Sequence, residues 1–166
     1  MRYVMKEKFW TLTNQFDIRD DTGKVVFLVK GQFFSLGDKL SFQDPSGNEL
    51  LFIRQKMLSL GHTFLLERKG EVIARVYRHL FTLIRYRFTV DVPGPNDLEA
   101  AGDFLNHEYT FTRPGAAGPV ATASKRWFSW VDTYGIDIAP GEDDVMLLAC
   151  AVVIDLVMHP SDGRLS

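Results

Sequence analysis

The segment from Asp144 to His159, D-V-M-L-L-A-C-A-V-V-I-D-L-V-M-H, constrains the fold of this chain more than any other stretch. Its residues from Val145 to Ile154 are apolar apart from the thiol of Cys150. Acidic residues precede it and Pro160 follows it, which predicts a helix over about residues 143–159 and a short tail over 160–166. Because such a helix is apolar on every side, it must be surrounded on all sides.

A lipid bilayer does not suit this helix. Spanning the hydrocarbon core takes about 20 apolar residues, and a helix of this length reaches only about 22 Å. Asp155 also interrupts the apolar run, and a carboxylate at the centre of a membrane helix costs about 2.5–3.5 kcal/mol. We therefore predict that the helix does not span a membrane and that the protein itself surrounds it.

The rest of the chain supplies strands for that purpose. Short apolar or alternating segments recur every 8–12 residues between turn-forming residues, and we count about twelve of them, beginning at residues 8–12 and ending at 133–138. A closed sheet of about eleven or twelve strands has room for one helix along its axis. The predicted fold is therefore all-β with one central helix, a barrel of about twelve antiparallel strands that encloses the hydrophobic C-terminal α-helix. We expect residues 1–166 to form one domain.

Two parts of the sequence resemble a known family. They are S-K-R-W-F-S-W-V-D-T-Y-G-I-D-I-A-P-G-E-D-D-V-M-L-L-A-C-A-V-V-I-D (residues 124–155) and the opening R-Y-V-M-K-E-K-F-W with F-D-I-R-D-D-T-G-K-V-V-F-L-V-K-G (within residues 2–31). Both are similar to the LURP-one-related family, which shares a barrel with a central helix with the tubby C-terminal domain and the phospholipid scramblases. The resemblance implies that fold, and likeness to the tubby domain implies binding of phosphoinositides on basic strands.

Charge is distributed unevenly, which is a hint about partners. Residues 54–87 carry eight basic and two acidic side chains, and residues 88–166 carry four basic and twelve acidic ones. Basic side chains on adjacent strands can bind the phosphates of lipid headgroups. The candidate residues for anionic phospholipid binding are Arg54, Lys56, Arg68, Arg75, Arg78, Arg85 and Arg87. The alternative interpretation is a solvated outer face that keeps the barrel soluble.

Other kinds of site find less support in the sequence. The acids before the helix lack the spacing of a calcium loop, and the scramblases' cysteine-rich and proline-rich segments have no counterpart here. Histidines 62, 79, 107 and 159 are far apart and show no metal-binding spacing, so we expect no metal site and no cofactor. Cys150 is expected to be an inert core residue. Asp155 is expected at the barrel mouth, reaching water or an arginine, and a buried functional carboxylate is the alternative. The sequence contains no nucleophile motif and no nucleotide-binding motif that would indicate an enzyme.

The leading functional hypothesis is thus a non-enzymatic binding or scaffold module whose partner is an anionic phospholipid headgroup or a protein. A small-ligand-binding protein or enzyme with a pocket at the barrel mouth is the first alternative. A nucleic-acid-associated regulator is the second, and the acidic last third of the chain disfavours it because phosphate contacts need a basic surface. A single cysteine and a charged N-terminus without an apolar signal region favour a cytoplasmic location, with peripheral membrane contact if lipid is bound.

Overall fold

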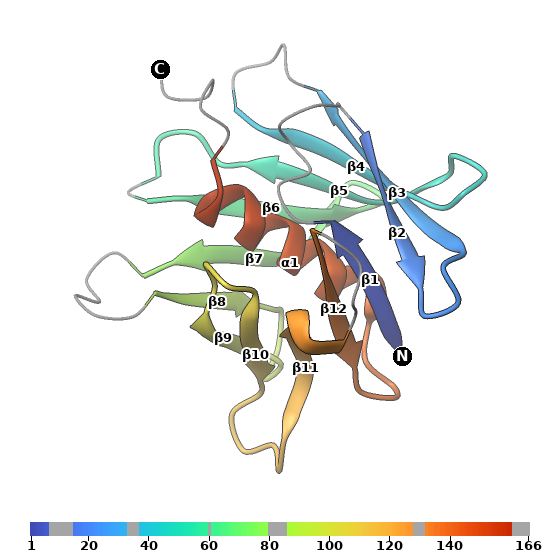
Figure 1. Ribbon diagram of the computed structural model, residues 1–166. Helices are drawn as coiled ribbons and strands as arrows, with labels where there is room; N and C mark the ends of the chain where they lie inside the picture. Colours follow the sequence, from blue (N-terminus) through green and yellow to red (C-terminus); the bar gives the residue numbers. More distant parts are fainter. Residues whose placement is uncertain (7–14, 33–36, 60, 80–85, 128–131, 161–166) are drawn as a thin grey trace.

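In the computed structural model, twelve antiparallel strands form a closed barrel around one helix (Figure 1). The structure describes residues 1–6, 15–32, 37–59, 61–79, 86–127 and 132–160. Each strand pairs with its neighbours in the sequence, and β1 pairs with β12 to close the barrel. The elements are β1 (Arg2–Lys6), β2 (Gln15–Asp20), β3 (Val25–Gln32), β4 (Lys39–Gln43), β5 (Glu49–Gln55), β6 (Thr63–Arg68), β7 (Glu71–Arg78), β8 (Arg87–Asp91), β9 (Leu98–Asp103), β10 (Glu108–Thr112), β11 (Pro119–Ser124), a short 3-10 helix (Lys125–Trp127), β12 (Thr133–Ile138) and α1 (Asp144–Met158).

The strands form because their side chains alternate between an apolar inner face and a more polar outer face. In β5, Leu51 and Ile53 are buried while Phe52 and Arg54 are only partly covered. The register places Ile53 opposite Leu66 of β6, so the inward residues of neighbouring strands lie side by side. A slip of one residue would turn every inward side chain of a strand outward, and this fixes the register around the barrel.

Helix α1 runs through the inside of the barrel (Figure 1). Every residue from Met146 to Met158 is buried, including those on opposite sides of the helix. The prediction of a barrel around its own C-terminal helix is therefore confirmed, with helix bounds one residue inside the predicted ones at each end. Among the described residues, no helix is long and apolar enough to cross a membrane.

The two ends of the barrel differ. At one end, which we call the C-terminal mouth, α1 ends together with the odd-numbered strands from β1 to β11 (Figure 1). The opposite end, the N-terminal mouth, holds the start of α1 and the tight turns between β2 and β3, β4 and β5, and β6 and β7. Several acids lie at the N-terminal mouth, in the turns and before the helix: Asp20, Asp21, Asp44, Glu71, Glu142, Asp143 and Asp144.

The first strand of the described structure precedes the first strand that the sequence predicted. The predicted strand at residues 8–12 lies outside the described residues, and the first described strand is β1, Arg2–Lys6. It pairs with β12 over its whole length, from Arg2 opposite Asp137 to Lys6 opposite Thr133. The amino group of Met1 also donates a hydrogen bond to the carbonyl of Ile138. β1 thus pairs with a strand that is far away in the sequence, and local sequence carries no sign of that partner.

Candidate functional site

The seven basic residues proposed for lipid binding do not form one patch. Arg68 lies at the N-terminal mouth, where its guanidinium contacts Asp143 at 2.9 Å. Arg85 lies outside the described residues. Three others form ion pairs on the outer wall with acids of the adjacent strands: Arg54 with Glu67 at 2.6 Å, Arg75 with Asp91 at 3.8 Å, and Arg87 with Glu99 at 2.7 Å. These pairs neutralise much of the positive charge that the sequence concentrates in residues 54–87.

Lys56 and Arg78 remain without such a partner. Within the described part of the chain, no carboxylate lies within ion-pair distance of either side chain. Lys56 is exposed just beyond β5, and Arg78 ends β7 with its guanidinium 5.5 Å from the centre of the Tyr86 ring. Both lie at the C-terminal mouth, and the chain joins them through β6: Lys56 donates its backbone N–H to the Thr63 carbonyl, and Arg78 donates its own to the carbonyl of His62.

An open cavity lies beside these two residues. Its volume is about 330 Å³, and its lining consists of Gln55, Lys56, Met57, Leu58, Ser59, Gly61 and His62. Ser59 holds the loop in shape, because its hydroxyl donates to the carbonyls of Lys56 at 3.1 Å and Gly61 at 2.9 Å. The cavity has the size of a small ligand site, since such sites begin at about 300 Å³.

The charge of Arg78 influences this cavity. The pKa of His62 is lowered, first by partial desolvation and then by the positive charge of Arg78, and Asp38 offsets the shift only in part. A neighbouring cation disfavours a second positive charge on the imidazole. The same positive potential favours an anion in the cavity, with Lys56 on its wall.

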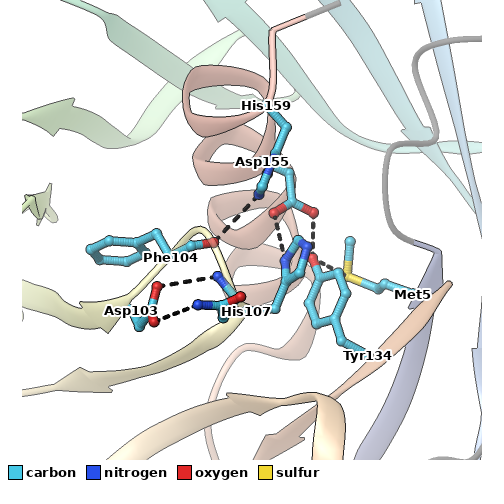
Figure 2. Close-up of polar contacts among 8 residues, drawn as sticks. Met5, Asp103, Phe104, His107, Tyr134, Asp155 and His159 are labelled. Carbon is cyan, nitrogen blue, oxygen red and sulfur yellow. Dashed lines mark hydrogen bonds and ion pairs between the residues drawn. The ribbon is translucent and has the colours of Figure 1, made fainter.

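A second group of polar side chains is buried behind this mouth, around Asp155 of α1 (Figure 2). Asp155 is 3% exposed, contrary to the expectation that it reaches water or an arginine. Its Oδ2 accepts a hydrogen bond from the hydroxyl of Tyr134, and its Oδ1 lies 3.3 Å from Nδ1 of His107. The Tyr134 ring stacks on the His107 ring at 4.2 Å. A buried carboxylate needs such partners because burying an unpaired charge is costly.

The hairpin between β9 and β10 positions His107. Asp103 accepts hydrogen bonds from the backbone N–H of Asn106 at 3.2 Å and from its side-chain amide at 2.7 Å. His107 then adopts a left-handed backbone conformation with φ of 52°, which is unusual for a residue with a side chain. The turn directs the imidazole inward, against α1, where it is 1% exposed. Strained residues of this kind cluster at functional sites.

The end of α1 brings a second histidine to the group. His159 caps the helix and donates its backbone N–H to the Asp155 carbonyl at 2.9 Å, so the two side chains project from successive turns on one face. Its ring stacks on that of His107 with 4.8 Å between centroids. One ligand atom each of His107, Asp155 and His159 lie within 4.8 Å of one another. The spacing of the histidines in the sequence did not predict that these three residues lie together. The spacing of Asp155 and His159, D-x-x-x-H on a helix, indicates only that these two side chains share one face of the helix.

Burial keeps two other groups of the interior protonated. The pKa of the Tyr134 hydroxyl is raised well above its usual value, mainly by burial and then by the charge of Asp155, so Tyr134 remains a hydrogen-bond donor. Burial likewise raises the pKa of the Cys150 thiol. Cys150 is therefore a core residue without thiolate character, as the sequence predicted.

Together, these features define a class of protein: a closed twelve-stranded β-barrel that encloses its own C-terminal helix. The chain belongs to the LURP-one-related family, whose profile matches residues 1–155. It is 34% identical over 66 residues to "Uncharacterized protein YxjI" of Bacillus subtilis (strain 168), a match that covers 40% of this chain and 40% of that protein. The resemblance found in the sequence is thus confirmed.

A solved structure shows the same fold. It is an X-ray structure of a protein from Arabidopsis thaliana, which superposes with a TM-score of 0.64 at 19% sequence identity. The superposition covers 92% of this chain and 88% of the plant protein. At this level of identity the likeness concerns the fold alone, and it agrees with the tubby-like barrel that the family resemblance implied.

Proposed function

We propose that this protein is a non-catalytic binding module that recognises anionic phosphorylated lipid headgroups at its C-terminal mouth. The observation that carries the proposal is the cavity of about 330 Å³ lined by Lys56 and His62, with Arg78 beside it. Lys56 and Arg78 have no carboxylate partner in the described residues, so their charge is available to a ligand. Charge-assisted hydrogen bonds to phosphate oxygens are among the strongest that such side chains make.

The placement of charge supports a headgroup as the ligand. The acids gathered at the N-terminal mouth repel an anionic surface from that end and orient the C-terminal mouth toward it. A membrane approached in this way would meet exposed Lys56 together with the exposed apolar side chains of Met57 and Leu58. Apolar residues beside cations are the combination that holds peripheral proteins at a lipid interface.

Cosedimentation with liposomes tests the proposal. Vesicles of neutral lipid with a few per cent phosphoinositide should bind the protein, and added salt should weaken the binding because charges are screened. The double variant Lys56→Glu with Arg78→Glu should lose most of the binding. Arg75→Gln is the matched control: Arg75 is exposed on the same strand as Arg78 but is paired with Asp91, so binding should be nearly unchanged. Failure of the wild-type protein to bind, or full binding by the double variant, refutes the proposal.

The same cavity also supports a second candidate function, the binding of a soluble phosphorylated small molecule. Its polar lining and its volume suit a free ligand as well as a lipid headgroup. A soluble inositol phosphate distinguishes the two. If it binds the wild-type protein with the same dependence on Lys56 and Arg78 while vesicles do not, the small-ligand function replaces the membrane function.

A further inference from the structure

We propose that His107, Asp155 and His159 form a binding site for a divalent transition metal ion, with Zn²⁺ as the ion that best matches the ligands. The three residues come from the β9–β10 hairpin and from the last turn and cap of α1 (Figure 2). Two imidazoles and one carboxylate are a ligand set that zinc accepts, with the fourth position left to water.

The distances between the atoms suit a metal better than a hydrogen bond. Nδ1 of His107 and Oδ1 of Asp155 are 3.3 Å apart, yet both atoms are buried and neither has a hydrogen-bond partner of acceptable geometry among the residues that the structure describes. Two ligand atoms on a tetrahedral zinc ion, each bonded at about 2.0–2.1 Å, are separated by about 3.3 Å. The contact between His107 and Asp155 therefore already has the spacing of two zinc ligands.

The third ligand is close and is held by the helix. Asp155 and His159 are four residues apart in a helical turn closed by a 2.9 Å backbone hydrogen bond. Their ligand atoms and that of His107 lie within 4.8 Å of one another. Nε2 of His159 meets only a long contact of 3.4 Å with the carbonyl of Phe104.

Tyr134 provides the support that metal ligands normally have. Its hydroxyl donates to Oδ2 of Asp155, which orients the carboxylate and leaves Oδ1 directed at His107 (Figure 2). Hydrogen bonds from such outer residues are worth about 10–100-fold in metal affinity. Tyr134 is itself fully buried, so its ring holds this hydroxyl in place.

The outermost residue of the cluster reaches the surface of the barrel. His159 is only half-buried at the C-terminal mouth, and the following Pro160 is exposed. His107 and Asp155 lie directly behind it.

Metal titration of the full-length protein tests the site. The protein is stripped with EDTA, dialysed, and titrated with ZnSO₄ by calorimetry, and with Co²⁺ followed by visible absorption. We expect one ion per chain, an absorption spectrum of Co²⁺ with nitrogen and oxygen ligands, and a melting temperature that rises with zinc concentration. His159→Gln should weaken binding more than tenfold, and Tyr134→Phe should weaken it about tenfold or more.

His79→Gln is the matched control, because His79 is exposed at the same mouth but lies outside the cluster. It should bind zinc like the wild-type protein. His159→Gln is the decisive variant since this half-buried cap can change without emptying the core. Absence of stoichiometric binding to the folded wild-type protein, or unchanged binding in His159→Gln, overturns the proposal and leaves His107 and Asp155 as an ion pair alone.

Discussion

The guanidinium of Arg68 lies 2.9 Å from the carboxylate of Asp143, although the two residues are 75 positions apart. The same carboxylate caps α1 by accepting a hydrogen bond from the backbone N–H of Met146 at 3.0 Å. Asp143 thus joins the end of β6 to the start of the central helix. Arg68, a candidate for lipid binding in the sequence, has a structural partner at the mouth opposite the cavity.

This arrangement predicts a graded effect at Asp143. Asp143→Ala removes both the cap and the ion pair, and should lower the free energy of unfolding by about 1–2 kcal/mol. Asp143→Asn keeps a capping oxygen and should cost less than about 1 kcal/mol. Urea unfolding measures both, with Asp21→Ala in the exposed β2–β3 turn as the control. Equal losses in the two Asp143 variants would show that the cap contributes nothing.

The interior around α1 should not tolerate a charge. Ala149 is fully buried at the middle of the helix, so Ala149→Asp places an unpaired carboxylate in the core and costs several kcal/mol. We expect loss of cooperative melting followed by circular dichroism. Val145→Asp is the matched change on the same helix, at a partly buried position in its first turn, where the helix dipole favours an acid. An Ala149→Asp protein that melts like the parent would contradict the enclosed helix.

Gly102 should be irreplaceable in the hairpin that positions His107. Its φ of 143° is a conformation that side chains rarely adopt, and an added Cβ would lie 2.5 Å from the Glu108 carbonyl oxygen. Gly102→Ala should therefore cost about 1–3 kcal/mol or more. Gly118→Ala is the control: no atom lies within 4 Å of its added Cβ, and its effect should stay within about 0.5 kcal/mol. Similar unfolding midpoints for the two variants would argue against the close approach of β9 and β10.

The ion pair between Arg113 and Glu142 predicts a pH dependence. Two hydrogen bonds of 2.9 and 2.8 Å join the groups, and the hydrogen bond from Arg113 is the main reason that the pKa of Glu142 is lowered from 4.5. Because the carboxyl binds its proton more weakly in the folded protein, the pair stabilises the fold above about pH 4.5 and loses this effect as the pH falls through the lowered pKa.

Glu142→Gln should therefore be less stable than the wild-type protein at pH 7, by about 1 kcal/mol, and the difference should shrink below pH 4.5. Guanidinium unfolding at pH 7 and at pH 3 measures it. Glu71→Gln, at an exposed position on β7, should show little difference at either pH. A stability gap for Glu142→Gln that stays constant or grows on acidification would contradict the assignment.

The contacts of the functional residues are the part of the structure that the sequence did not predict. A linear count of charges over residues 54–87 does not reveal the acids that adjacent strands place beside Arg54, Arg75 and Arg87. The spacing of the histidines along the chain predicts no metal site. His107 and His159 meet because a hairpin turn and the end of a helix converge in space, a relation that spacing cannot express.

The amino-acid sequence alone indicates that a helix apolar on every side needs a complete enclosure, and that about twelve alternating strands can provide it. Both conclusions rest on periodicity, which is a local property of the chain. The folded barrel adds what periodicity cannot supply: which strand closes the barrel, which arginines are neutralised, and that Asp155 contacts both Tyr134 and His107. The physical reason is that these contacts join residues distant in sequence, and their energies depend on a geometry that exists only once the barrel has closed.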